Sequence, residues 1–191
     1  MTTATASSKS SLKKNMPTLL ILIVSGALIY ALPYFRYYYY DAFVKLFNIT
    51  NTQMGALGSA FGGTAIIGYM FGGFFADRWP TRYLLTISLV TTGLLGYVLL
   101  TYPPYPVVLA IHLALGITSI VTFWSALIKA IRSLADGDEQ GRAFGLFEGG
   151  RGVVNMVQSA IILSMFGYIA AKFGEKSALS AVIAVYSTIC L

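Results

Sequence analysis

The stretch GGFFADRWPTR, residues 72–82, joins two long apolar runs of this chain. One run covers residues 53–76 and the other covers residues 82–101. Each provides roughly the 20 apolar residues that a helix needs to cross the hydrocarbon core of a bilayer. Within the stretch, Asp77 is suited to cap a nearby helix N-terminus, and its basic neighbours are suited to the membrane interface. The pattern predicts a short polar turn between two transmembrane helices.

The composition of the whole chain agrees with a membrane location. Of 191 residues, 57% are apolar and 10% are charged, and the mean hydropathy is +0.73. Soluble domains carry about 25% charged residues, so we expect an integral membrane protein. A single cysteine, Cys190, and a single histidine, His112, argue against a disulfide framework and a zinc cluster. The net charge of +6 is dispersed between apolar runs, so we expect no nucleic-acid partner.

Hydropathy predicts an all-α chain with six transmembrane helices. The expected spans are residues 18–47, 53–76, 82–101, 106–132, 141–171 and 177–191.

The six-helix bundle is expected to cover residues 18–191. Residues 1–17 are expected to form a cytoplasmic tail. A secretory signal is the alternative, and it is disfavoured because no small-x-small cleavage site follows the apolar stretch. The last span is short for a membrane crossing, so we expect the sixth helix to be incomplete and the chain to be a fragment or a truncated product.

The distribution of basic residues predicts the orientation, because cytoplasmic loops carry an excess of Lys and Arg. A cytoplasmic N-terminus puts three basic residues outside, Lys45, Lys172 and Lys176. Eight then lie inside, namely Lys9, Lys13, Lys14, Arg78, Arg82, Lys129, Arg132 and Arg142. We therefore expect a bacterial inner (plasma) membrane protein with its N-terminus in the cytoplasm.

Glycines recur at steps of four, as in Gly58/Gly62, Gly68/Gly72 and Gly141/Gly145/Gly149. Such steps allow helix backbones to approach closely. Ordinary bundle packing is one interpretation, and smooth surfaces that let helices slide are the other.

The turn at residues 72–82 resembles the loop between spans two and three of the major facilitator superfamily, G-x-x-x-D-[RK]-x-G-[RK]-[RK]. Gly73, Asp77, Arg78 and Arg82 match that pattern, whereas Pro80 and Thr81 replace its second glycine and a basic residue.

The resemblance implies a twelve-helix fold in two halves, of which this chain is the N-terminal one. A C-terminal six-helix half is then expected beyond residue 191. The resemblance also implies that the loop gates a conformational change, with Asp77 paired to Arg132 at the end of span four.

Three charged residues are well placed inside predicted spans, away from the ends of the spans. Arg36 stands in ALPYFRYYYYDAF, residues 31–43, and Glu148 and Arg151 stand in FEGGRGVV, residues 147–154. Such residues mark functional sites by default. Glu148 and Arg151 are three apart, so they can pair on one helix face.

An ion pair at Glu148 leaves one guanidinium unneutralised. If both arginines face one cavity, its net charge is positive, and the planar guanidinium suits phosphate, sulfonate or carboxylate. Glu148 either carries a proton or positions Arg151, and the sequence leaves both open.

The chain also resembles the organophosphate:phosphate antiporter branch, of the glycerol-3-phosphate transporter type. The resemblance covers Tyr34-Phe35-Arg36 and the loop at residues 77–82, DRWPTR, which is close to the branch's pattern D-R-x-x-P-R but has its proline one place earlier. It implies that Arg36 binds substrate, and that Tyr69, Trp124 and Arg151 occupy the positions of a binding lysine, a tryptophan and a binding histidine. The arginine carries over to this chain, whereas the lysine and the histidine do not.

For the other polar and aromatic residues, the sequence indicates a role less specifically. Successive helical positions are about 100° apart, so we expect Tyr37 or Tyr40, but not both, to contact substrate. The remaining tyrosines suit an interfacial belt. His112 is expected to be hydrogen-bonded within the bundle, and Asn155 and Gln158 to line the same path as Arg151.

Together these patterns predict a secondary active transporter that moves a small organic anion by alternating access. No cofactor or metal is expected, and no nucleophile–base pair or phosphate loop suggests an enzyme. Two alternatives stay open: a proton-coupled sugar or drug transporter in which Arg36 and Glu148 are a structural pair, and an anion sensor of the same fold that does not transport.

Overall fold

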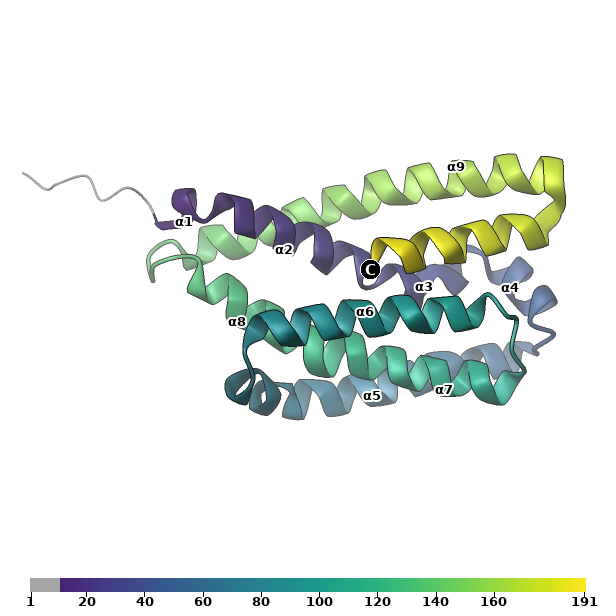
Figure 1. Ribbon diagram of the computed structural model, residues 1–191, viewed down its shortest axis with the longest axis horizontal. Helices are drawn as coiled ribbons and strands as arrows, with labels where there is room; N and C mark the ends of the chain where they lie inside the picture. The colour runs from purple at the N-terminus through teal and green to yellow at the C-terminus, as the bar shows by residue number, and fades with distance from the viewer. Residues whose placement is uncertain (1–10) are drawn as a thin grey trace, which may run out of the picture.

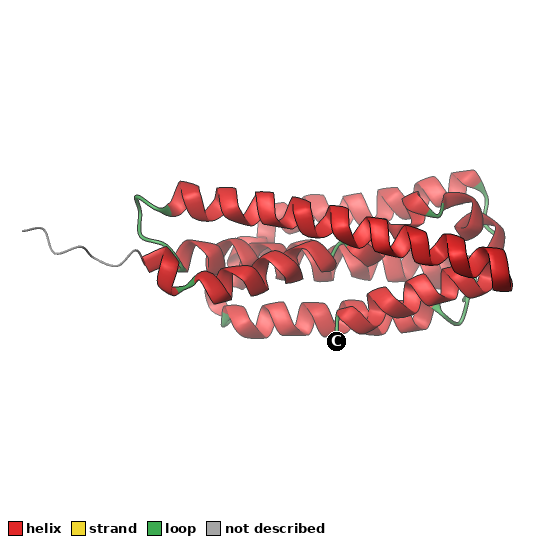
Figure 2. Ribbon diagram, turned by 90° about the horizontal axis from the view of Figure 1, so that it is seen from above, coloured by secondary structure: helices red, strands yellow, loops and turns green. Residues whose placement is uncertain are grey.

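The computed structural model describes residues 11–191, and these residues form helices without a strand (Figures 1 and 2). The all-α prediction is therefore confirmed for this part of the chain. The helices are α1 (Ser11–Lys14), α2 (Met16–Leu28), α3 (Ala31–Tyr38), α4 (Tyr40–Leu46), α5 (Asn51–Arg78), α6 (Thr81–Leu99), α7 (Tyr105–Gly116), η1 (Ile117–Trp124), α8 (Ser125–Ser133) and α9 (Gln140–Ile189).

The end of the predicted tail packs onto the bundle. Lys9 and most of the tail lie outside the described residues, but Ser11 and Asn15 both donate side-chain hydrogen bonds to the carbonyl of Leu134, at 3.1 and 2.9 Å. The main-chain N–H of Leu12 donates to Glu139. These bonds attach α1 to the loop between α8 and α9.

The first predicted span, residues 18–47, is broken into α2, α3 and α4 instead of running as one helix. The axes of α2 and α3 meet at 43°. Pro33 explains the break, because it has no N–H to donate and its ring would clash with the carbonyl four residues earlier, at Ile29. A second break falls at Tyr39, whose backbone (φ −117°, ψ 40°) is not helical.

The turn predicted within residues 72–82 lies at Trp79 and Pro80, which connect α5 to α6. At its other end, α5 starts with a capping box, in which Gln53 N–H donates to Thr50 Oγ1 and Thr50 N–H donates to Gln53 Oε1. Pro80 then separates α5 from α6.

The fourth passage runs from Tyr105 to Ser133, and its middle section, η1, is wound as a π-helix. Hydroxyls that bond back to main-chain carbonyls compete with the helical N–H groups. Ser119 and Thr122 do so within η1, to the carbonyls of Leu115 and Thr118. The wide turns of η1 pack on α5 at Gly68, where a Cβ would lie 3.0 Å from Ile120 Cγ2.

The fifth and sixth predicted spans are the two arms of α9, which reverses direction at Gly174 (Figure 1). Gly174 has φ 83° and ψ 162°, a conformation that glycine adopts without the steric cost of a Cβ.

By length and composition, four of the described helices can cross a membrane, or five when α2 and α3 count as one bent span. Large apolar side chains are exposed on their surface, including Ile66, Met70, Met156 and Phe173. Exposed apolar area of this extent fits contact with lipid.

The glycine predictions divide between two helices. Gly68 and Gly72 of α5 are in close contact with η1 and α8, as the packing interpretation expects. Gly141, Gly145 and Gly149 of α9 are not in close contact with another helix within residues 11–191, because a Cβ at any of them would meet nothing within 4 Å.

Candidate functional site

A polar cavity of about 340 Å³ lies where the broken first passage, α5, η1 and the first arm of α9 meet. The side chains that line it are those of Tyr30, Tyr34, Tyr69, Ile120, Trp124, Arg151 and Asn155. Arg151 is the one charged side chain in this lining.

Local irregularities in the helices position several of these residues. Tyr30 lies at the break that Pro33 causes between α2 and α3, and its hydroxyl donates to the carbonyl of Ser119 at 3.4 Å. Ile120 and Trp124 come from the π-helical turns of η1. Widened turns of this kind are frequent at functional sites.

Arg151 is held in place by an acid and two aromatic rings. Its Nη2 and Nε donate to Glu148 Oε2 at 2.6 and 3.2 Å, so the pair expected from the spacing of three is formed. Its guanidinium carbon lies 5.1 Å from the centre of the Trp124 ring and 5.6 Å from that of Phe147. The guanidinium has five N–H donors, so three remain for other partners.

The cavity brings together three of the predicted site residues, Tyr69, Trp124 and Arg151. Asn155, predicted to lie along the same path, also lines it. Tyr30 and Ile120 were missed by the sequence reasoning, and Tyr34 was quoted as part of a family resemblance but not as a site residue. The spacing of four between Tyr30 and Tyr34, on either side of Pro33, was a usable signal for the first of these.

Arg36 lies elsewhere, in the interior of the bundle, with none of its surface exposed. One Nη donates to the carbonyl of Pro33, and the other donates to Tyr37 Oη at 2.8 Å. A Cβ at Gly58 would lie 3.5 Å from the Arg36 guanidinium, so α5 covers it closely. The two arginines that were expected to face one cavity are therefore not together in this conformation.

Within residues 11–191, Arg36 takes part in no ion pair, and its Nε has no hydrogen-bond partner. The structural pair of Arg36 with Glu148, which belonged to the alternative of a sugar or drug transporter, is not formed, because Glu148 is bonded to Arg151.

The two tyrosines proposed as alternative ligand contacts have other partners. Tyr37 accepts the hydrogen bond from Arg36, whose guanidinium carbon lies 4.4 Å from the ring centre. Tyr40 donates to Asn51 at the start of α5, at 3.0 Å. Neither lines the cavity. The expected hydrogen bond of His112 is present, since Nδ1 lies 2.8 Å from the carbonyl of Val108.

At the end of the bundle that holds the α5–α6 turn, Asp77 pairs with Lys129 and not with Arg132 as expected. Lys129 Nζ lies 3.5 Å from Asp77 Oδ1 and donates to the carbonyl of Ala76 at 2.7 Å. The carbonyls at the end of α5 attract a cation, and Lys129 reaches them first because it lies one turn before Arg132 on α8.

The other predicted gating residues lie on the three helices at this end of the bundle, α5, α6 and α8. Gly73 and Arg132 line a hollow of about 310 Å³ together with Asp77 and Lys129. The other two arginines lie on neighbouring rings, Arg78 over Phe74 and Arg82 over Tyr83.

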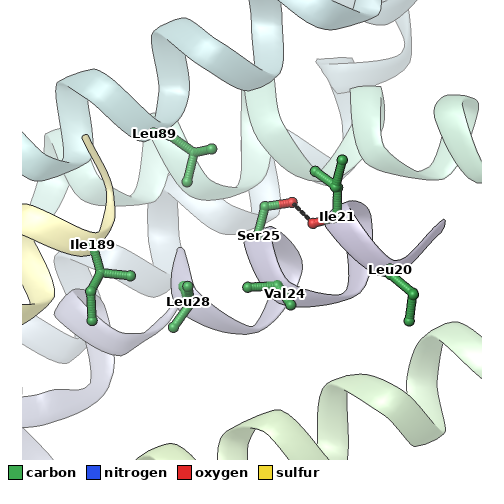
Figure 3. Close-up of a pocket in the computed structure, with 7 residues that line it drawn as sticks. All are labelled: Leu20, Ile21, Val24, Ser25, Leu28, Leu89 and Ile189. Carbon is green, nitrogen blue, oxygen red and sulfur yellow. Dashed lines mark hydrogen bonds between the residues drawn. The ribbon is translucent and has the colours of Figure 1, made fainter. Parts of the chain in front are cut away.

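A further hollow of about 380 Å³ separates α2 from α6 and the end of α9 (Figure 3). Leu20, Ile21, Val24, Leu28, Leu89 and Ile189 line it, and its single hydroxyl, Ser25, already donates to the carbonyl of Ile21. An apolar lining without free polar groups fits lipid or helix packing better than a polar solute, so the Arg151 cavity is the stronger candidate site.

The long apolar helices and the polar cavity between them are those of an integral membrane protein. The chain belongs to the Major Facilitator Superfamily, because the model of that family matches residues 17–191.

Among its relatives are two proteins of Escherichia coli (strain K12). The chain is 38% identical to inner membrane protein YqcE over 172 residues, which cover 90% of this chain and 40% of YqcE. It is 35% identical to inner membrane protein YihN over 154 residues, 81% of this chain and 37% of YihN. An uncharacterized protein of Mycoplasma pneumoniae is 28% identical over 182 residues, 87% of this chain and 37% of that protein. The chain thus spans about two fifths of the length of these relatives. No solved structure matched it.

Proposed function

We propose that the chain forms the N-terminal six-helix half of a secondary active transporter of the inner membrane. Six helical passages support this count: the broken first passage, α5, α6, the α7–η1–α8 passage and the two arms of α9. The length of the relatives leaves room for a second half, and two of them are named as inner membrane proteins. The transporter works by alternating access, with its substrate site between the halves.

The substrate of this transporter is a small organic anion with a phosphate, sulfonate or carboxylate group. The observation that carries this proposal is the Arg151 guanidinium, which lines a polar cavity and keeps three donors after it has bonded Glu148. Glu148 acts here as the residue that orients Arg151. Arg36 adds a buried positive charge without an ion-pair partner in the described part of the chain, which favours anions over cations.

The α5–α6 turn and the helix ends beside it, residues 72–82, gate the movement of the helices. The Asp77–Lys129 pair joins the end of α5 to α8, and a pair this exposed contributes about 0–1 kcal/mol. Such a weak contact opens and closes readily during a transport cycle. The likeness to the organophosphate:phosphate antiporter branch supports phosphate among the candidate head groups.

Uptake by the intact protein in proteoliposomes tests the proposal, with radiolabelled organic phosphates, sulfonates and carboxylates as substrates. We expect Arg151→Gln to lower uptake of the best substrate at least about tenfold, because a hydrogen bond to a charged group contributes about 1.5–3 kcal/mol. The matched control is Arg142→Gln, on the same helix but exposed and outside the cavity. Unchanged uptake by Arg151→Gln would contradict the proposal.

A neutral sugar is the second candidate substrate, because the cavity is rich in tyrosine and Arg151 is already paired with Glu148. That candidate requires uptake of uncharged sugars driven by a proton gradient. A sensor would bind an anion without accumulating it. The same proteoliposomes distinguish all three.

A further inference from the structure

A second, smaller hollow of about 130 Å³ adjoins the Arg151 cavity. Tyr30, Tyr34 and Asn155 line both spaces, so the two are neighbouring compartments with a shared wall. The smaller hollow has no charged side chain in its lining. Its own polar groups are those of Tyr38, Gln158, Ser159 and Tyr186.

The residues that line one or both compartments lie on one face of α9 and on one face of the broken first passage. On α9, Arg151, Asn155 and Ser159 are spaced four apart and share one face. Facing them are Tyr30, Tyr34 and Tyr38, also spaced four apart along the broken first passage. Eight residues of helix span about 12 Å. The path therefore changes over this length from a charged end to an uncharged polar end.

One atom in the smaller hollow lacks a partner. Gln158 Oε1 is buried and accepts no hydrogen bond from any residue in the 11–191 region. A buried carbonyl oxygen without a donor is costly. A ligand hydroxyl would satisfy it, because a hydroxyl can donate to the amide oxygen and accept from the tyrosines at the same time.

We propose that the two compartments select an organic anion with one anionic group and a hydroxyl-rich, uncharged tail, with the anionic group at Arg151 and the hydroxyls at Gln158 and Ser159. The inference rests on the proposed function and adds the substrate class. A second charged group on the tail is excluded, since the smaller hollow offers it no counter-charge and desolvation would be unfavourable. A fully apolar tail is disfavoured because it would leave the polar lining unpaired.

Isothermal titration calorimetry on the intact protein in detergent tests this with three probes of six carbons. Gluconate carries both the anion and the hydroxyls, hexanoate carries the anion alone, and sorbitol carries the hydroxyls alone. We expect gluconate to bind at least about tenfold tighter than hexanoate, which corresponds to one or two net hydrogen bonds. Sorbitol 6-phosphate and hexyl phosphate form a second pair that covers a preference for phosphate.

Variants then locate the hydroxyl subsite. Gln158→Leu is expected to bring the affinity for the hydroxylated anion within about threefold of that for its apolar counterpart, whose own affinity stays unchanged. Ser159→Ala is a milder change of the same kind, should Gln158→Leu fold poorly. Ser164→Ala is the matched control, because this serine lies further along α9, is exposed and lines neither compartment.

The outcomes separate this inference from the proposed function. If the hydroxylated and apolar anions bind equally and Arg151→Gln abolishes both, the anion function stands and the hydroxyl subsite is overturned. If sorbitol binds as tightly as gluconate, both proposals fail in favour of a sugar transporter. If none of the five probes binds, both are overturned.

Discussion

The two arginines in the membrane region have opposite environments. Arg151 borders a cavity and is paired with Glu148, which sits one turn away on the same helix. Arg36 is fully buried and depends on a main-chain carbonyl and a tyrosine hydroxyl. Arg36 has no counter-ion among residues 11–191, and such a buried charge is unfavourable, so its presence is better explained by function than by stability.

Arg36→Met tests that argument, because methionine fills much of the same volume without a charge. We expect the melting temperature of the purified protein to stay the same or rise, since apolar replacement of buried ionic groups is often neutral or stabilising by about 1–4 kcal/mol. Anion uptake should fall at least about tenfold, as a stability–activity trade-off predicts. Thermal melts in detergent and proteoliposome uptake provide the two readings.

One outcome of the Arg36→Met experiment would contradict a functional role for Arg36. A fall of several degrees in the melting temperature, with uptake per folded protein unchanged, would make Arg36 a structural residue. The hydrogen bonds to Pro33 and Tyr37 would then be its role.

At the scale of elements, hydropathy located the helices but not their irregularities. A scan of apolar content cannot detect the break at Tyr30 or the π-helical turns at residues 117–124. Pro33 is a local signal for the first, whereas η1 depends on hydroxyls of Ser119 and Thr122 that bond back to main-chain carbonyls.

The sequence likewise predicted one contact of the candidate site and missed others. The Glu148–Arg151 pair follows from a spacing of three on one helix. The burial of Arg36 was not predictable, because side-chain direction at a broken helix depends on neighbours such as Gly58. The Asp77–Lys129 pair was missed because family resemblance favoured Arg132, one turn further on.

The contact between α5 and α8 offers a matched pair of glycines. A Cβ at Gly72 would lie 2.9 Å from the carbonyl oxygen of Val121 and 3.2 Å from Ser125 Cβ, whereas a Cβ at Gly73 would meet nothing within 4 Å. We expect Gly72→Ala to destabilise the fold by about 1–3 kcal/mol through overpacking. Gly73→Ala should be neutral or slightly stabilising, because alanine favours helix. Unfolding in SDS, followed by circular dichroism, measures both, and equal stability of the two variants would contradict the close approach of α5 to α8 at Gly72.

At the scale of the whole molecule, charged contacts lie at the two ends of the bundle. At one end, Lys45 of α4 bonds Glu175, beside the reversal at Gly174, at 2.7 Å. At the other end, Lys129 bonds Asp77 near the α5–α6 turn. Figure 1 shows the α9 reversal and the α8–α9 loop at opposite ends of the long axis. Lys45, counted as outside, and Lys129, counted as inside, are therefore separated along this axis.

Cysteine labelling in intact cells tests which end faces the cytoplasm. In a Cys190→Ser background, Lys176→Cys and Asp136→Cys each place one exposed thiol at an opposite end. A membrane-impermeant maleimide should label Lys176→Cys in intact cells and Asp136→Cys after permeabilisation alone. Neither change removes the bias in basic residues, since eight still face two in the first variant and eight face three in the second. The reverse labelling pattern would invert the orientation and place the Asp77–Lys129 gate on the outer side of the membrane.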